Sequence, residues 1–183
     1  MASVLMILAE GFEETEAIAV VDVLRRGEVN VVMAGLTAGP VSSSRGVKII
    51  PDAELDKVNA DDFDMVVLPG GRPGTDNLIA DDRVKKILQD MARKDKYTAA
   101  ICAAPTVLSE AGLLNDKHAT GHPSVQGMLK GATVSKDERV VIDGKVVTSQ
   151  GAGTAIDFGL KLVELFKGKE KAESIRQAMV YTR

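Results

Sequence analysis

The stretch Ala99-Ala100-Ile101-Cys102-Ala103-Ala104-Pro105-Thr106 runs from an apolar segment into a proline that favours the first turn of a helix. The apolar segment, Tyr97 to Ile101, has the length of a buried strand. Strand, sharp turn and helix in this order form the repeating unit of a parallel sheet that is covered by helices. The stretch therefore predicts an α/β fold with Cys102 at a strand–helix turn.

Apolar runs of the same kind recur along the chain and predict four more main strands. They are rich in valine and isoleucine, and their apolar character indicates burial on both faces of a sheet. The runs are Val4 to Ala9, Val29 to Ala34, Met65 to Leu68 and Val146 to Ser149. Two antiparallel hairpins are also expected, one within Ser42 to Ile50 and one within Val140 to Val147, where Asp143-Gly144 is a turn signal.

Between these runs, apolar residues repeat at the spacing of a helix with one buried stripe. The repeats are Ala17, Val20, Val21 and Leu24; Val84, Ile87, Leu88 and Met91; Ile156, Leu160 and Val163; and Ile175 with Met179. Gly27 follows the first repeat as a predicted C-terminal cap. Strands that alternate with helices in this way predict a three-layer α/β/α sandwich around a mostly parallel sheet.

Length and composition are those of an ordinary globular protein, and one domain covering residues 1–183 is expected. The 23 Lys and Arg residues against 26 Asp and Glu give a net charge of −3. With four Phe, two Tyr and no block of basic residues, no stable nucleic-acid binding is expected. The run Val4 to Ala9 is too short to span a membrane, so a cytoplasmic protein is predicted. One cysteine and two histidines are too few for a closed zinc site, and neither metal nor cofactor is expected.

Cys102 is the first candidate for chemistry, because ligands bind outside the carboxyl ends of the strands in such a sheet. At the start of a helix, free N–H groups and the positive end of the helix dipole stabilise a thiolate. We therefore expect the pKa of Cys102 to lie below the free-thiol value of about 8.5. The alternative interpretation is a buried cysteine that only packs.

Three glutamates open the first helix, after the first predicted strand. Glu13 and Glu14 suit a helix cap, since acidic residues complement the helix dipole. Glu16 is placed to point toward the mouth of the sheet, where a desolvated carboxyl has a raised pKa and can donate a proton. The residues alone do not separate Glu16 from its neighbours.

Two loops supply further candidates. Gly70-Gly71, after the third main strand, permits close backbone approach and an oxyanion hole, although a tight turn explains the glycines equally well. His122 precedes Pro123 and is held extended, so its ring can be aimed at the site; a surface histidine is the alternative. The glycine-containing stretch Thr148 to Thr154 lacks the spacing of a dinucleotide-binding motif, so no nucleotide site is predicted there.

Taken together and in this order, the motifs resemble the DJ-1 family, that of the parkinsonism-associated deglycase, within the ThiJ/PfpI superfamily. The resemblance covers essentially the whole chain. The matching pieces are Gly11-Phe12-Glu13-Glu14-Thr15-Glu16, Ser44-Arg45-Gly46-Val47, Val67-Leu68-Pro69-Gly70-Gly71, Ala99-Ala100-Ile101-Cys102-Ala103-Ala104-Pro105, His122-Pro123 and Thr148-Ser149-Gln150-Gly151-Ala152-Gly153-Thr154. The resemblance implies a flavodoxin-like homodimer that needs no cofactor.

Residue roles follow from the resemblance by position. Cys102 is implied as nucleophile, Glu16 as general acid and base, and His122 as an auxiliary group. Gly71 and Ala103 are implied as backbone oxyanion donors.

Other matches and departures concern the surroundings of the site. Arg45 and Arg26 match arginines that flank the pocket near the dimer interface, and they are candidates for holding an anion. Ala152 replaces the usual proline. Gln150 stands where animal members of the family tend to have arginine, and in this the chain resembles the bacterial branch. Ser43 and Ile50 stand where the family has accessory cysteines, which leaves Cys102 alone for any redox role.

Three functions are open to such a site. The first is a dicarbonyl-handling enzyme, a glyoxalase or a protein and nucleotide deglycase that protects against glycation and oxidative stress. The second is a redox sensor or chaperone that acts through oxidation of Cys102. The third, ranked last, is a cysteine peptidase or amidotransferase, because that branch has a histidine directly after the cysteine and this chain has Ala103 there.

The predicted partners are small dicarbonyls or glycated amines and thiols, and a second copy of the chain. A two-fold interface is expected from the first helix and the hairpin near Arg45. Arg25 and Arg26 would supply charge beside apolar Val20, Val23 and Val47.

Overall fold

The computed structural model describes residues 2–182 and has a seven-stranded central sheet with the order β10-β11-β7-β6-β1-β2-β5. Neighbouring strands pair in parallel except β10 and β11, which are antiparallel. The strands are β1 (Ser3–Leu8), β2 (Asn30–Gly35), β5 (Ala53–Glu54), β6 (Met65–Leu68), β7 (Tyr97–Ile101), β10 (Val140–Asp143) and β11 (Val146–Ser149). The five predicted main strands and the mostly parallel sheet are confirmed.

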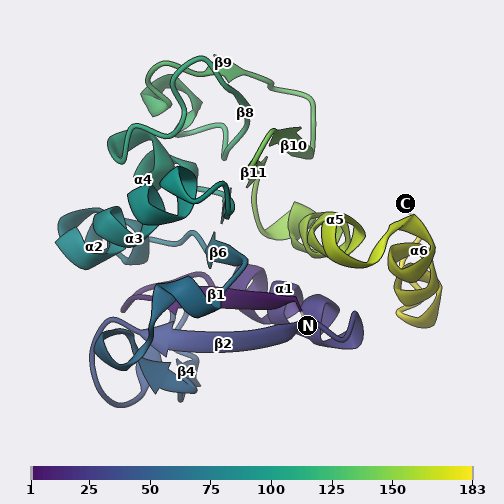
Figure 1. Cartoon of the computed structure of the whole chain (residues 1–183), viewed down its shortest axis with the longest axis horizontal. Coiled ribbons are helices and arrows are strands. Elements are labelled where there is room, and N and C mark those ends of the chain that lie inside the picture. The colour runs from purple at the N-terminus through teal and green to yellow at the C-terminus, as the bar shows by residue number, and fades with distance from the viewer. Residues whose placement is uncertain (1, 183) are drawn as a thin grey trace.

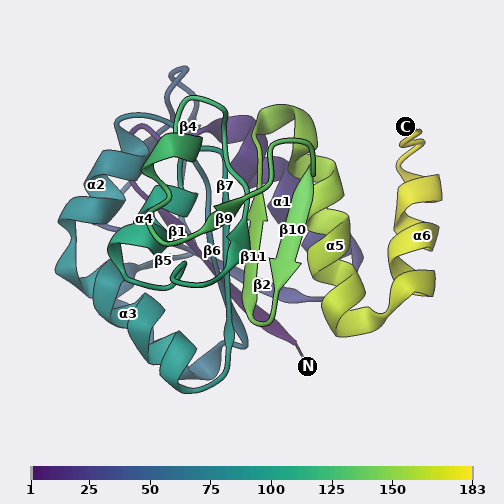
Figure 2. The same cartoon turned by 90° about the horizontal axis from the view of Figure 1, so that it is seen from above.

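Helices cover both faces of this sheet (Figure 2). One layer holds α2 (Gly74–Ala80), α3 (Asp82–Arg93) and α4 (Pro105–Glu110), and the other holds α1 (Glu14–Arg26) and α5 (Ala155–Lys167). The last helix, α6 (Lys169–Ala178), packs on the outside of α5 (Figure 1). The predicted flavodoxin-like α/β/α sandwich is therefore confirmed, with one apolar core on each side of the sheet.

Both predicted hairpins form. β10 and β11 are joined across Asp143-Gly144, and Gly144 has a φ of +60°. The other hairpin consists of β3 (Val41–Ser42) and β4 (Lys48–Ile49), which stay outside the main sheet. Short elements that the apolar pattern does not predict are β5, α2, β8 (His118–Ala119), β9 (Thr133–Val134) and the 3-10 helices Leu55–Lys57, Ala60–Asp62, Gln126–Met128 and Ala152–Thr154.

Close packing of α1 against α5 fixes the helix that carries Glu16. A Cβ on Gly27 would lie 2.8 Å from Val163, and one on Gly159 would lie 2.9 Å from Val23, so these glycines let the helices approach. Gly27 caps α1 as predicted. Val20 and Val23 are fully buried in this contact, so their predicted place on a dimer surface is wrong. Their stripe faces the core because it is the apolar face of an amphipathic helix.

Strand order also indicates where a ligand would bind. From β1 the chain passes through α1 to β2 on one side, while β6 pairs with β1 on the other side. The carboxyl ends of β1 and β6 thus form a topological switch point, where α/β sheets leave a crevice. The loop after β6, the start of α1 and the turn after β7 meet near this crevice.

Candidate functional site

Cys102 occupies the turn between β7 and α4 with a φ of +66°, a left-handed conformation that is uncommon for a residue other than glycine. Its backbone is held on both sides. The N–H donates to the Ser149 carbonyl at 3.0 Å, and the carbonyl accepts from the His122 N–H at 2.8 Å. The ends of β7 and β11 and the loop after β8 therefore fix the half-buried thiol in place.

Two backbone N–H groups, those of Gly71 and Ala103, lie beside the thiol sulfur and lower the thiol pKa. Gly71 has a φ of +95°, and a Cβ there would lie 2.5 Å from the Glu13 nitrogen. Only glycine fits this position, which explains one of the two glycines after β6. The structure thus brings both predicted backbone donors to Cys102.

Glu16 is buried beside the same sulfur, with 1% of its surface exposed. Glu13 caps α1 by accepting the Glu16 N–H at 2.7 Å, so the capping role expected for Glu13 is confirmed. The Glu16 Oε2 atom accepts the Gly70 N–H at 2.8 Å, and Oε1 is buried with no hydrogen-bond partner among residues 2–182. Burial raises the pKa of Glu16 to about 7, more than the neighbouring Cys102 thiol and the Gly70 N–H lower it.

Burial also raises the pKa of the Cys102 thiol to about 12, and the nearby Glu16 carboxylate is the next largest cause. The expectation of a lowered pKa is therefore wrong. It counted the N–H donors at the helix start, which do lower the pKa, but it left out desolvation and the negative charge of Glu16.

His122 is exposed and lies at the edge of the site. Its Nδ1 atom is 2.8 Å from the Ser124 hydroxyl oxygen and 3.3 Å from the Ser124 backbone nitrogen. A backbone N–H can only donate, so Nδ1 is an acceptor and the neutral ring carries its proton on Nε2. The ring thus presents a donor, held by Ser124, rather than a base.

A cavity of about 160 Å³ opens onto the thiol, lined by Gly71, Arg72, Cys102, Ala103, His122, Ser124 and Val125. Gly151 borders the same space: a Cβ there would lie 3.6 Å from His122 Cδ2 and 4.0 Å from both Cys102 Sγ and Glu16 Oε1. Arg72, Ser124 and Gly151 were not among the predicted site residues. Arg72 and Ser124 each stand within two residues of a predicted site residue, which is the signal that could have found them.

The structure does not bring the two predicted anion-binding arginines to this cavity. Arg26 lies at the far end of α1, ten residues and thus about 15 Å from Glu16 along the helix axis, and it pairs with Asp22 at 2.8 Å. Arg45 is exposed in the β3–β4 hairpin, where its guanidinium reaches the Ser44 carbonyl at 3.5 Å. A role for either residue at the site would need a second subunit.

Residues 2–182 contain neither a metal-ligand cluster nor a membrane-spanning helix. No group of three or more His, Cys, Asp or Glu side chains in this part of the chain is arranged to hold a metal ion. No helix in the same part is both long and apolar enough to cross a bilayer. In the loop after β11, the Thr154 hydroxyl accepts a hydrogen bond from the Gly151 N–H at 3.1 Å. The Gly151 N–H is therefore paired within the loop rather than offered to an anion.

Solved structures share the whole architecture. The crystal structure of Drosophila melanogaster DJ-1beta aligns with a TM-score of 0.96 at 41% identity, covering 100% of this chain and 99% of that one. The oxidized form of Toxoplasma gondii DJ-1 aligns with a TM-score of 0.95 at 33% identity, covering 100% of both chains.

Curated relatives are similar over nearly the full length. The dj-1beta protein of Drosophila melanogaster is 42% identical over 180 residues, which is 97% of this chain and 96% of that protein. The glutathione-independent glyoxalase DJR-1.2 of Caenorhabditis elegans is 35% identical over 174 residues, 95% of this chain and 93% of that protein. The family model described as the DJ-1/PfpI family matches residues 2–165, and the chain belongs to this family.

Proposed function

We propose that this protein is a cysteine-dependent enzyme that converts 2-oxoaldehydes to hydroxy acids, acting as a glyoxalase and as a deglycase of glycated proteins and nucleotides. One observation carries the proposal: the buried carboxyl of Glu16 lies beside Cys102, and no cation among residues 2–182 neutralises it. The name of the Caenorhabditis elegans relative supports the same reaction class.

The pair holds a mobile proton at neutral pH. With the Glu16 pKa raised to about 7 and the thiol pKa to about 12, the two groups share one proton over the range between. A proton on Oε1 would satisfy that buried oxygen by donating to a thiolate, which the N–H groups of Gly71 and Ala103 also stabilise. This arrangement supplies a nucleophile and an acid together.

The reaction then follows with methylglyoxal as the example. The thiolate adds to the aldehyde carbon, forming a C–S bond, and Glu16 gives its proton to the new oxyanion. The Glu16 carboxylate removes the hydrogen from this first carbon and returns it as a proton to the second carbon, while the hydroxyl proton passes from the first oxygen to the second. Water hydrolyses the resulting thioester and releases lactate and the free thiol.

A glycated amine enters as its carbinolamine. The amine takes the Glu16 proton and leaves as the C–N bond breaks, and the thiolate forms a C–S bond to the same carbon, which gives the same hemithioacetal. His122 assists by donating from Nε2 to a substrate oxygen. Its Nδ1 atom is engaged by Ser124 rather than by the thiol, which disfavours the peptidase interpretation.

A homodimer is part of the proposal. Ile18 on α1 and Val47 and Ile50 near the hairpin are exposed apolar side chains, with 39%, 46% and 78% of their surface accessible. They would form the apolar centre of a two-fold interface, with Arg45 at its rim. A single thiol with no partner for a disulfide also suits a reducing compartment such as the cytoplasm.

The test is a steady-state assay of lactate formation from methylglyoxal, run beside Cys102→Ser. Many equivalents of lactate per thiol are expected from the unmodified protein, with loss of activity in the variant. Equal rates in both proteins would contradict the role of the thiol.

A redox sensor is the second candidate, because the two N–H donors and a protonated Glu16 could also hold the oxygens of a Cys102 sulfinate. Turnover separates the two functions. A sensor consumes about two equivalents of a peroxide oxidant per thiol in reaching the sulfinate, and it produces no lactate.

A further inference from the structure

Arg72 lines the cavity above Cys102 and is the residue through which a positive charge can act there. Among the residues that line this cavity, Arg72 is the one with a formal charge, and it directly follows Gly71, whose N–H lowers the pKa of the thiol. The Arg72 side chain is 56% exposed, so a small molecule entering from solvent can reach it.

The guanidinium of Arg72 is also weakly paired. Its ionic partner is Asp76, with 4.0 Å between Nε and Oδ1. Other arginines bind carboxylates far more closely: the distance is 2.6 Å for Arg83 with Asp81 and 2.6 Å for Arg176 with Glu173. Arg72 therefore keeps most of its capacity to bind a second anion.

A cation at this place has a specific effect on substrate choice. The reacting form of the pair carries a negative charge, which repels an anionic substrate from the cavity. Arg72 offsets this repulsion, and its planar fork of donors matches a carboxylate. A cavity of about 160 Å³ admits only a small molecule.

We propose that Arg72 is a specificity residue that selects carbonyl compounds bearing a carboxylate over neutral ones. The substrate class rests on the function proposed above, and it is that of 2-oxoaldehydes with a carboxylate on the far end of a short chain. The selection of anions by the cavity does not depend on turnover.

Alkylation of Cys102 by iodoacetate and by iodoacetamide tests the anion selection directly. In both reactions the thiolate forms a C–S bond to the methylene carbon, and iodide leaves with the electrons of the C–I bond. The reagents are nearly equal in size and differ in charge. The ratio of their second-order rates within one protein cancels any change in the thiolate fraction between proteins.

Arg72→Gln is expected to lower the ratio of iodoacetate to iodoacetamide rates about two- to fivefold, the range of a half-exposed ion pair. Arg72→Lys should retain most of it. Asp76→Asn, which removes the competing carboxylate, should raise the ratio. Added salt should lower the ratio in the unmodified protein and have less effect in Arg72→Gln.

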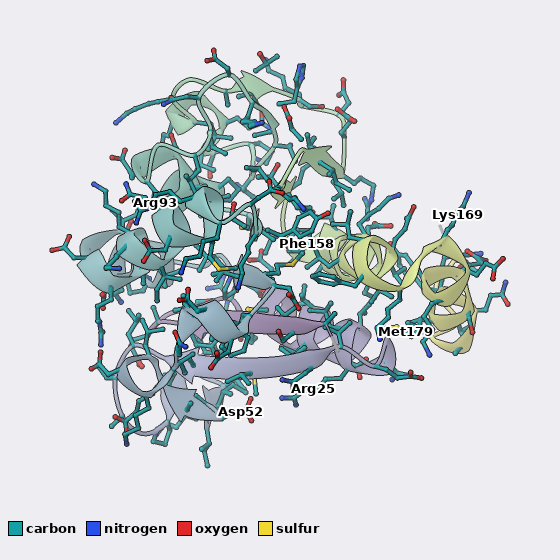
Figure 3. The ribbon with its side chains drawn as sticks, viewed as in Figure 1. Arg25, Asp52, Arg93, Phe158, Lys169 and Met179 are labelled. Carbon is teal, nitrogen blue, oxygen red and sulfur yellow. The ribbon has the colours of Figure 1, made fainter. Side chains whose placement is uncertain are left out.

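Arg93→Gln is the matched control, because Arg93 lies at the end of α3, is 67% exposed and pairs with Asp90 (Figure 3). The ratio of iodoacetate to iodoacetamide rates in Arg93→Gln should equal that of the unmodified protein. An unchanged ratio in Arg72→Gln, or an equal fall in Arg93→Gln, would overturn the proposal.

A substrate arm uses methylglyoxal against 4,5-dioxopentanoate, which has the same 2-oxoaldehyde head and a carboxylate. The kcat/KM preference for the carboxylate should fall in Arg72→Gln together with the alkylation ratio, and an unchanged preference would overturn the assigned substrate class. If neither compound is turned over but the alkylation ratio falls, the proposed function fails while anion selection by Arg72 stands.

Discussion

Two neighbouring helices, α1 and α5, each carry a buried carboxyl at the third helical position, Glu16 and Asp157 (Figure 1). The two residues are 1% and 2% exposed. Asp157 binds the Arg139 guanidinium, with 2.7 Å from Nε to Oδ2, and the Tyr181 hydroxyl at 2.8 Å. Glu16 has the Gly70 N–H and a thiol instead.

The difference shows how the partner of a buried carboxyl decides its use. Asp157 beside Arg139 raises the pKa of that guanidinium and ties the end of the chain to β10 and α5. A buried carboxylate that is paired with a cation in this way stabilises the folded structure. Glu16 has no cationic partner in the described part of the chain, so burial raises its pKa to about 7, where it can exchange a proton during a reaction.

The largest effect is expected when the Glu16 proton is removed from the chemistry. Glu16→Gln should lower kcat for lactate formation about 100- to 10,000-fold, because an amide cannot carry a proton between carbons. Alkylation of Cys102 by iodoacetamide should change far less, because the amide can still donate a hydrogen bond to sulfur. Turnover close to that of the unmodified protein would remove Glu16 from the mechanism.

The second expected effect is on stability against pH. The folded-state pKa of Glu16 is raised from 4.5 to about 7, so its contribution is fully present below pH 4.5 and is lost as the pH rises to about 7. This loss is about 3 kcal/mol. Urea unfolding at several pH values should show this loss. The free energy of unfolding should fall more steeply with pH in the unmodified protein than in Glu16→Gln. Parallel curves between pH 4.5 and 7 would show that Glu16 ionises normally.

A smaller effect is expected at Asp157. Asp157→Asn should lower the free energy of unfolding by about 1–2 kcal/mol, because Arg139 loses a charged partner but remains half exposed to water. Lactate formation should remain within about twofold. A fall in kcat as large as that of Glu16→Gln would break the contrast between the two carboxyls.

The last expected effect concerns the dimer surface, where the loss of turnover should be far smaller than that of Glu16→Gln. Val47→Asp puts a charge at the proposed interface, which should lower the oligomer mass in light scattering and reduce turnover several-fold through α1. The contacts of Asp157 with Arg139 and Tyr181 should be unaffected by this substitution. A fully active monomer of the unmodified protein at micromolar concentration would contradict this coupling.

Much of this architecture could be predicted from local patterns. The apolar runs predicted the main strands, because burial on both faces leaves a clear signal in the sequence. The turn before Pro105 placed Cys102 at the carboxyl end of a strand. Glu16 could not be separated from Glu13 and Glu14 by residues alone, since the choice depends on the Gly70 N–H, which lies 54 residues away. Desolvation of Cys102 likewise depends on the packed structure.

Surface assignments were less predictable for a related reason. Val20 and Val23 suit an interface by composition, but the periodicity of α1 turns them toward α5. Arg26 suits an anion site by resemblance, but its helix ends far from the thiol. In both cases the direction of a side chain, rather than its type, decides the role.

The left-handed backbone of Cys102 has a consequence for how this protein can change over generations. A side chain at a φ of +66° costs about 1–2 kcal/mol relative to a relaxed conformation, and glycine avoids this cost. Mutation of Cys102 to glycine would therefore tend to increase stability while deleting the thiol. Selection for stability alone would therefore favour loss of the thiol, so persistence of the cysteine in a lineage would indicate that the thiol is needed.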